Sequence, residues 1–154
     1  MEPSVAQDHP LLRQVDNLLR KATDREGALT AVVQAVHESS ASYDWTGIYL
    51  VEGDELVLHN FIGAASPHTR IRIGEGICGA AAQQKQTVMV PDVSEDQRYL
   101  ACSLETRSEI VVPITKLGYV LGEIDVDSHT PDAFGERDQQ VLEEVARRLA
   151  ALFG

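Results

Sequence analysis

Residues 101–128 read ACSLETRSEIVVPITKLGYVLGEIDVDS, and this stretch decides the fold. Two segments of alternating residues flank the connection Lys116-Leu117-Gly118, a pattern typical of a β-hairpin. The residues expected on one side are Ile110, Val112, Ile114, Val120, Gly122, Ile124 and Val126. Those expected on the other side are Glu109, Val111, Leu121, Glu123, Asp125 and Asp127.

The connection also predicts how the two arms pair. A three-residue hairpin loop with Gly118 in the left-handed position would place Thr115 opposite Tyr119. Counting back along both arms from that pair, Glu109 lies directly across from Asp125.

The same side of the hairpin therefore carries three acids, Glu109, Asp125 and Asp127, with Cys102 at the entrance. Because like charges opposite one another destabilise a sheet, such a cluster needs a cation, or one member keeps a proton. We interpret it as the functional centre of the chain. The alternative is that Asp125 and Asp127 are ordinary solvated strand positions.

The composition indicates a soluble globular domain over residues 1–154. Hydrophobic residues make up 44% and charged residues 24% of the chain, and the net charge is -11. This acidic balance argues against a partner made of nucleic acid or anionic lipid. Since no apolar run approaches the ~20 residues of a membrane helix and the start lacks a signal-peptide pattern, we expect no membrane association and a cytoplasmic location.

The two cysteines, Cys78 and Cys102, can form a single bridge. A domain of this size does not need that bridge for stability, so one hypothesis is that the two cysteines form a redox or catalytic pair. The other is that they are two buried, small apolar side chains. Residues 74–84 are predicted to form a glycine-rich turn that runs into a short helix. Cys78 would then lie at or near the helix N-terminus, where the helix dipole is expected to stabilise a thiolate.

Aromatic residues mark a second feature of the predicted site. Residues 45–52 alternate as a strand and place Trp45, Gly47 and Tyr49 on one face. A glycine between two aromatic rings leaves a gap that could receive a ligand.

Amphipathic helices are predicted over residues 10–22, over 25–39 and from about residue 136. With the intervening strands they indicate an α+β fold: a central antiparallel sheet of about six strands, helices packed on one face and a ligand pocket on the other. The polar segment 92–107, which contains Cys102, is expected to border this pocket. The first helix, within residues 1–22, could form a dimer contact.

Several motifs together resemble the GAF domain over residues 25–154. They are G-I-Y-L, G-E-G-I-C-G, P-D-V-S-x-D-x-R-Y-L, T-R-S-E-I-V-V-P-I and V-L-G-x-I-D-V-D-S. Within that superfamily, W-T-G-I-Y, G-I-C-G, A-C-S-x-E-x-x-S-E-I-V and I-D-V-D-S resemble the branch that reduces free methionine-(R)-sulfoxide.

The resemblance implies a role for each matching residue. It makes Cys102 the attacking thiol, Cys78 its partner cysteine, and Trp45 and Tyr49 the walls of the side-chain pocket. It makes Glu109, Asp125 and Asp127 the acids that hold the substrate. The third cysteine common in the family corresponds to His68 here. The resemblance implies thioredoxin as the reductant and no cofactor.

Two other readings of the chain stay open at this point. One is a sensory GAF module that binds a small amino-acid-like ligand without converting it. The other is a metal site formed by the three carboxylates with His68 or His129, although no regular ligand spacing supports it.

Overall fold

The computed structural model describes residues 9–99 and 105–154, so Cys102 lies outside the described residues. The helices are α1 (Pro10–Lys21), α2 (Arg25–Glu38), α3 (Gly76–Gln84) and α4 (Glu136–Ala150). The strands are β1 (Trp45–Glu52), β2 (Glu55–Ile62), β3 (Arg70–Arg72), β4 (Val88–Val90), β5 (Ser108–Lys116) and β6 (Tyr119–Ser128). The predicted α+β fold is confirmed, and the long helices agree with their expected ranges to within one residue.

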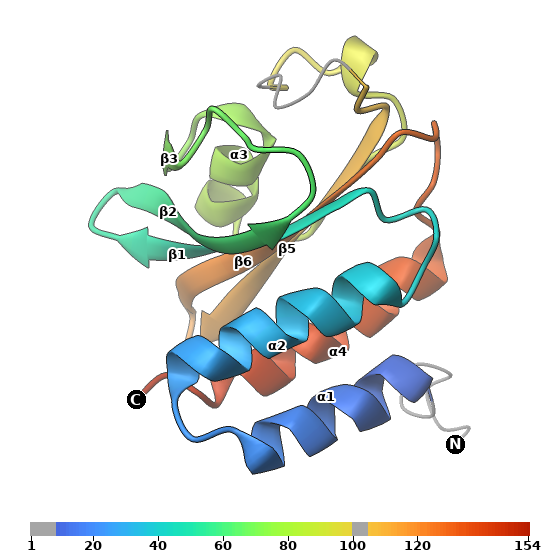
Figure 1. Ribbon diagram of the computed structural model, residues 1–154. Coiled ribbons are helices and arrows are strands. Elements are labelled where there is room, and N and C mark those ends of the chain that lie inside the picture. Colours follow the sequence, from blue (N-terminus) through green and yellow to red (C-terminus); the bar gives the residue numbers. More distant parts are fainter. Residues whose placement is uncertain (1–8, 100–104) are drawn as a thin grey trace, which may run out of the picture.

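All six strands form one antiparallel sheet in the order β3-β2-β1-β6-β5-β4. Helices α2 and α4 cover one face, and α1 packs outside them as a third layer (Figure 1). Helix α3 lies on the opposite face (Figure 1). The hairpin of β5 and β6 is central in the sheet, so both of its faces are covered.

Two separate apolar cores confirm the predicted sides of the hairpin. Ile110, Val112, Ile114, Ile124 and Val126 are buried against the helices α1, α2 and α4. Val111 is buried on the other face, in a cluster with Trp45, Tyr49 and Cys78. Because strand residues alternate between faces, the acids that neighbour these apolar residues must point toward the α3 side.

The predicted register of the hairpin is wrong by two residues. The loop is Leu117-Gly118, with φ angles of 53° and 83°, so Lys116 rather than Thr115 pairs with Tyr119. Thr115 pairs with Val120, and the next pair is Ile114 with Gly122. The residue left between these pairs is Leu121.

Leu121 therefore forms a β-bulge in β6, and the bulge moves all later pairs along the strand. Glu109 lies opposite Asp127 instead of Asp125, and Asp125 lies opposite Val111. The bulge also reverses the local alternation, so Leu121 packs against the helix-side core and Val120 against the other core, the reverse of the predicted sides.

Helix α3 is held close to the sheet edge by the glycine that follows Cys78. A Cβ atom on Gly79 would lie 2.6 Å from the backbone oxygen of Arg72 and 2.9 Å from the backbone nitrogen of Gly74. Only a residue without a side chain allows the first turn of α3 to approach the β3–α3 turn this closely. This contact holds the first turn of α3, which carries Cys78, against the β3–α3 turn.

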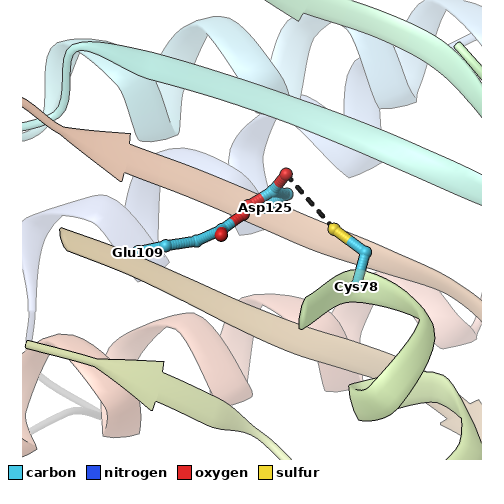
Figure 2. Close-up of side chains that lie close together, drawn as sticks. All are labelled: Cys78, Glu109 and Asp125. Carbon is cyan, nitrogen blue, oxygen red and sulfur yellow. Dashed lines mark hydrogen bonds between the residues drawn. The ribbon is translucent and has the colours of Figure 1, made fainter. Parts of the chain in front are cut away.

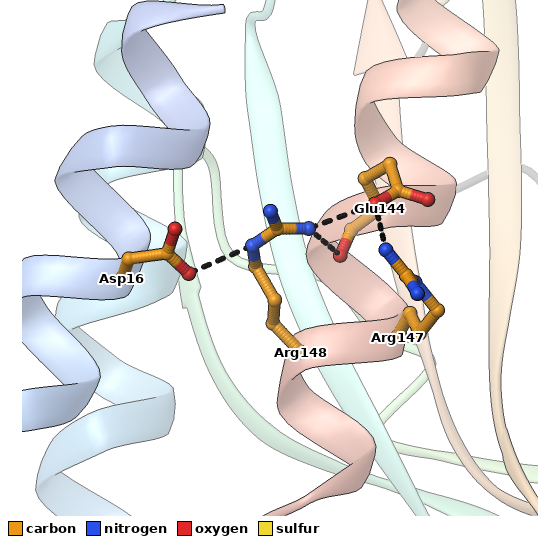
Figure 3. A network of polar contacts seen from close by, with 4 residues as sticks. All are labelled: Asp16, Glu144, Arg147 and Arg148. Atoms are coloured by element: carbon orange, nitrogen blue, oxygen red, sulfur yellow. Dashed lines mark hydrogen bonds and ion pairs between the residues drawn. The ribbon is translucent and has the colours of Figure 1, made fainter. Parts of the chain in front are cut away.

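Polar contacts join the first and last helices across the outer layer. The Arg148 Nε atom donates to Asp16 Oδ1 of α1 at 2.8 Å, and Arg148 Nη1 donates to Glu144 Oε1 at 2.9 Å (Figure 3). Arg147 also forms an ion pair with Glu144 (Figure 3). The apolar side of α1 is buried against α2 and α4, so a dimer contact through α1 would use its polar outer side.

None of the helices in the described residues combines the length and the apolar character required to cross a bilayer.

Candidate active site

The centre of the site is a cysteine thiol beside two carboxyl groups. Cys78 on α3, Glu109 on β5 and Asp125 on β6 each offer one ligand-type atom, and these three atoms lie within 4.8 Å of one another. The Cys78 Sγ atom donates a hydrogen bond to Asp125 Oδ2 at 3.3 Å (Figure 2). Three elements that are distant in sequence therefore converge on one point.

Two further acids extend this group along β6. Asp127 lies opposite Glu109, and Glu123 lies opposite Tyr49 of β1. All four acids have exposed fractions of 4% or less. Both carboxyl oxygens of Glu123, and the Oδ1 atoms of Asp125 and Asp127, have no hydrogen-bond partner within the described ranges 9–99 and 105–154.

The acids cannot all be ionised in this environment. Burial raises the pKa of Glu109 well above its usual range, and the charges of Asp125 and Asp127 raise it further. Burial and the charge of Asp125 likewise raise the pKa of Glu123 and of Asp127. The pKa of Asp125 is raised less, because hydrogen bonds from Glu109 and Cys78 favour its charged form and oppose the effect of burial. Asp125 is thus the acid of the group whose charged form is favoured by hydrogen bonds from both Glu109 and Cys78.

The expectation of a Cys78 thiolate is wrong for the resting protein. Cys78 does lie in the first turn of α3, but it is 5% exposed and faces the carboxyl groups. Burial raises the pKa of the Cys78 thiol well above its ordinary value, and the charges of Asp125, Glu109 and Glu123 raise it further. Desolvation and three nearby acids outweigh the dipole of a nine-residue helix.

Trp45 and Tyr49 lie on one face of β1, as predicted, and both are buried on the side of the sheet that also carries the acids. The predicted gap over Gly47, however, is filled. A Cβ atom on Gly47 would lie 2.8 Å from Trp45 Cζ3, because the indole ring folds back over the glycine. Phe61 of β2 stacks against that indole with ring centroids 5.7 Å apart. The glycine therefore positions the tryptophan instead of leaving room for a ligand.

Both aromatic residues are anchored to the loop that follows β2. Trp45 Nε1 donates to the carbonyl of Ala64 at 2.9 Å, and the Tyr49 hydroxyl donates to the carbonyl of His68, also at 2.9 Å. His68 is half-buried, and it holds Tyr49 through its backbone oxygen.

Two small pockets border the acid group. The first is lined by Tyr49, Ile71, Gly76, Ile77, Cys78, Glu109 and Asp125. The second is lined by Asp44, Trp45, Ala64, Glu105, Thr106, Asp127 and His129. The His129 ring lies 3.8 Å from an Asp44 oxygen and 3.6 Å from a Glu105 oxygen. Both pockets contain predicted site residues, while the predicted nucleophile, Cys102, lies outside the described part of the chain.

A metal site in this structure would have different ligands from those predicted. The one group of potential ligands found among the described residues is Cys78, Glu109 and Asp125, with no imidazole in it. The acids are accordingly close to a thiol that could ligate a soft cation, while His68 and His129 are not members of the group.

Two site residues were not predicted from the sequence. Glu123 was expected to share a face with Asp125 and Asp127, but nothing in the pattern separated a buried acid from a solvated one. Phe61 supports Trp45 across strands, and such a contact depends on the β1–β2 register, in which Gly47 pairs with Phe61.

Comparison with known proteins gives consistent matches. Residues 24–153 match the GAF domain family. The chain is 40% identical over 140 residues to GAF domain-containing protein A of Dictyostelium discoideum, covering 90% of this chain and 87% of that protein. It is 36% identical over 124 residues to the free methionine-R-sulfoxide reductase of Saccharomyces cerevisiae, covering 78% of this chain and 68% of that protein.

A solved structure extends this likeness to three dimensions. The free methionine-R-sulfoxide reductase of Neisseria meningitidis, in complex with its substrate, superposes with a TM-score of 0.90 at 35% identity. The match covers 99% of this chain and 92% of that chain.

Proposed function

The chain belongs to the GAF domain family, and we propose that it is a free methionine-(R)-sulfoxide reductase in which Cys102 is the attacking thiol. The observation that carries the proposal is the convergence of Glu109, Asp125 and Asp127 beside the wall of Trp45 and Tyr49. This arrangement offers buried acids for a small zwitterion and aromatic surface for its apolar end. The two reductases named above, from Saccharomyces cerevisiae and Neisseria meningitidis, support the same interpretation.

The acid group supplies the two things that the substrate needs. An ionised carboxylate, for which Asp125 is best suited, pairs with the ammonium group of the free amino acid. A protonated carboxyl, Glu109 or Asp127, donates its proton to the sulfoxide oxygen. One buried group thus holds a charge and a proton at neutral pH because its members cannot all ionise.

The chemical step transfers oxygen from the substrate to the enzyme. The sulfur of Cys102 attacks the protonated sulfoxide sulfur, the oxygen is transferred to Cys102, and methionine leaves as the thioether. Cys102 is left as a sulfenic acid. A thiol, for which Cys78 is the candidate within this chain, then forms a disulfide with it and releases water.

The chain contains two cysteines, and His68 stands where the resemblance places a third. Cys78 and Cys102 are accordingly the pair that an external dithiol of the thioredoxin type would reduce. A cytoplasmic setting and a homodimer are part of this proposal.

Turnover of free methionine-(R)-sulfoxide with dithiothreitol is the direct test. We expect the parent protein to release methionine and Cys102→Ser to lose activity by at least about a thousandfold. The (S) epimer and peptide-bound methionine sulfoxide serve as control substrates that are not converted. Undiminished activity in Cys102→Ser, or ligand binding by calorimetry without conversion, would contradict the proposal, and the second result would favour a sensory module.

Removing the stack of Phe61 on Trp45 should affect the reaction less than removing Cys102. In Phe61→Ala the indole loses a contact worth about 0.5–1.5 kcal/mol, so we expect KM to rise by about twofold to tenfold with kcat little changed. Tyr119→Ala is the matched control, because Tyr119 is an aromatic residue 72% exposed at the tip of the β5–β6 hairpin. An unchanged KM in Phe61→Ala would remove Phe61 from the pocket wall.

A further inference from the structure

The buried thiol of Cys78 makes a direct contact with one acid. Its Sγ atom donates to Asp125 Oδ2 at 3.3 Å, within the range of a hydrogen bond to sulfur (Figure 2). Cys78 and Asp125 are 5% and 1% exposed, so the pair is shielded from bulk water. The contact is formed in the resting protein and needs no rearrangement of either side chain.

The Cys78 thiol must lose its proton before it can react as a nucleophile, and its surroundings oppose that loss. The thiolate is the reactive form of cysteine, yet the groups that face Cys78 are acids: Glu109 from β5, and Glu123 and Asp125 from β6. In the first pocket Tyr49 of β1 also lines the space, and its hydroxyl donates to the carbonyl of His68. Cys78 therefore needs an acceptor for its proton at the moment of reaction.

Asp125 is the acid best placed to be that acceptor. Its Oδ2 atom already receives the thiol proton in a hydrogen bond, and its Oδ1 atom has no partner in the described residues. Hydrogen bonds from Cys78 and Glu109 favour the carboxylate form of Asp125. Burial and the charge of Asp125 favour protonated forms of its neighbours Asp127 and Glu123.

We propose that Asp125 is the general base that removes the Cys78 proton as the Cys78 sulfur attacks its electrophile. The inference rests on the proposed function, in which the electrophile is the sulfenic acid of Cys102. The Cys78 S–H bond breaks and its proton moves to Asp125 Oδ2, while the new S–S bond forms and the S–O bond of the sulfenic acid breaks. The departing hydroxide takes a proton from the acid group and leaves as water, so atoms and electrons balance.

This assignment gives Asp125 a role in each half of the catalytic cycle. While substrate is bound, its carboxylate faces the ammonium group. Once methionine has left, the same carboxylate has no ligand to hold and can accept a proton. The two roles follow one another, so one residue serves both without conflict.

The test isolates Cys78 from the reductase reaction. In a Cys102→Ser background Cys78 is the remaining cysteine of the chain, and its rate of modification by methyl methanethiosulfonate, a small neutral reagent, is followed by mass spectrometry. We expect Asp125→Asn to slow this modification by about a hundredfold. The control is Asp54→Asn, the same change at an exposed position in the β1–β2 turn, outside the acid group, and it should leave the rate unchanged.

Whether Asp125→Asn slows or speeds the modification decides whether Asp125 removes the Cys78 proton or acts on Cys78 through its charge alone. If Asp125 acted on Cys78 through its charge alone, its removal would lower the thiol pKa and speed the modification. An unchanged or faster rate in Asp125→Asn therefore overturns the proposal. Asp125→Glu, which keeps a carboxylate, should recover part of the lost rate.

A second measurement avoids any change at Asp125 and so does not depend on the folding of a variant. In the Cys102→Ser protein the modification rate should rise with pH while Asp125 loses its proton, then level off, and it should be slower in D2O. A rate that keeps rising about tenfold per pH unit up to pH 9 would indicate attack by free thiolate and would overturn the proposal. No methionine sulfoxide is present in these experiments, so failure of the proposed function and failure of this inference are separate results.

Discussion

Replacing Gly122 with Ala is expected to lower the free energy of unfolding by about 3 kcal/mol or more. Gly122 lies in β6 between two central strands, where it pairs with Leu50 of β1 and Ile114 of β5. A Cβ atom there would overlap the backbone oxygen of Tyr49 and lie 3.1 Å from Leu50 Cδ2. Because both neighbouring strands are held by hydrogen bonds and by the two cores, the clash cannot be relieved cheaply.

Urea unfolding followed by circular dichroism measures this loss. Gly154→Ala is the control, since no heavy atom lies within 4 Å of a Cβ atom at that position and its stability should be unchanged. A Gly122→Ala protein as stable as the parent would mean that β1 and β6 can separate locally, contrary to the packing described above. The same substitution also displaces the backbone of Tyr49, so the pocket wall should be disturbed along with the sheet.

Replacing Glu123 with Leu is expected to have the opposite effect, raising the free energy of unfolding by about 1–4 kcal/mol at neutral pH. Glu123 is fully buried, and neither carboxyl oxygen has a partner in the described part of the chain. A buried polar group without hydrogen bonds is costly, whereas a leucine of similar size offers only apolar atoms to the interior. The change therefore removes a penalty that the folded state carries.

The gain should depend on pH in a defined direction. Burial and the charge of Asp125 raise the pKa of Glu123 in the folded state. A group with a raised folded pKa favours folding below its unfolded value, about 4.3, and this contribution is lost as pH rises through the folded value. Glu123→Leu should consequently stabilise more at pH 8 than at pH 4, as measured by urea unfolding at both values.

Glu52→Leu is the matched control for that experiment. Glu52 is also a strand glutamate, at the exposed end of β1, and its replacement should change stability by less than about 0.5 kcal/mol. If Glu123→Leu proved less stable than the parent at both pH values, Glu123 would have to be a hydrogen-bonded group that supports the fold.

The hairpin explains why the site could be predicted although its register could not. Leu121 is an extra residue in β6, and a bulge leaves no mark in the alternation of apolar and polar residues. The loop places Leu117 at a φ of 53°, a conformation in which turn rules favour glycine or asparagine. Beyond the bulge the resulting error is two residues, and a shift of two leaves Glu109, Asp125 and Asp127 on their predicted face. The three acids therefore lie on one face, as predicted, although the residues opposite them in the neighbouring strand differ from those predicted.

The state of Cys78 could not be read from the sequence for a different reason. Its place at the start of α3 was predictable from the glycine-rich turn, and that place alone favours a thiolate. The acids that raise the pKa of the Cys78 thiol instead belong to β5 and β6, which follow Cys78 by about 30 to 50 residues in the sequence. The prediction of a gap over Gly47 was wrong for a similar reason. The indole that fills the gap is held by Phe61 and Ala64, which belong to other segments of the chain.

The folded-back indole of Trp45 has a practical consequence. It is the single tryptophan of the chain, and it lines the same pocket as Asp127. A wavelength that excites tryptophan and not tyrosine selects this residue, so all of the emission comes from this one position at the wall of the site. The protein thus carries its own optical probe, with which ligand arrival and the oxidation cycle can be timed without attaching a dye.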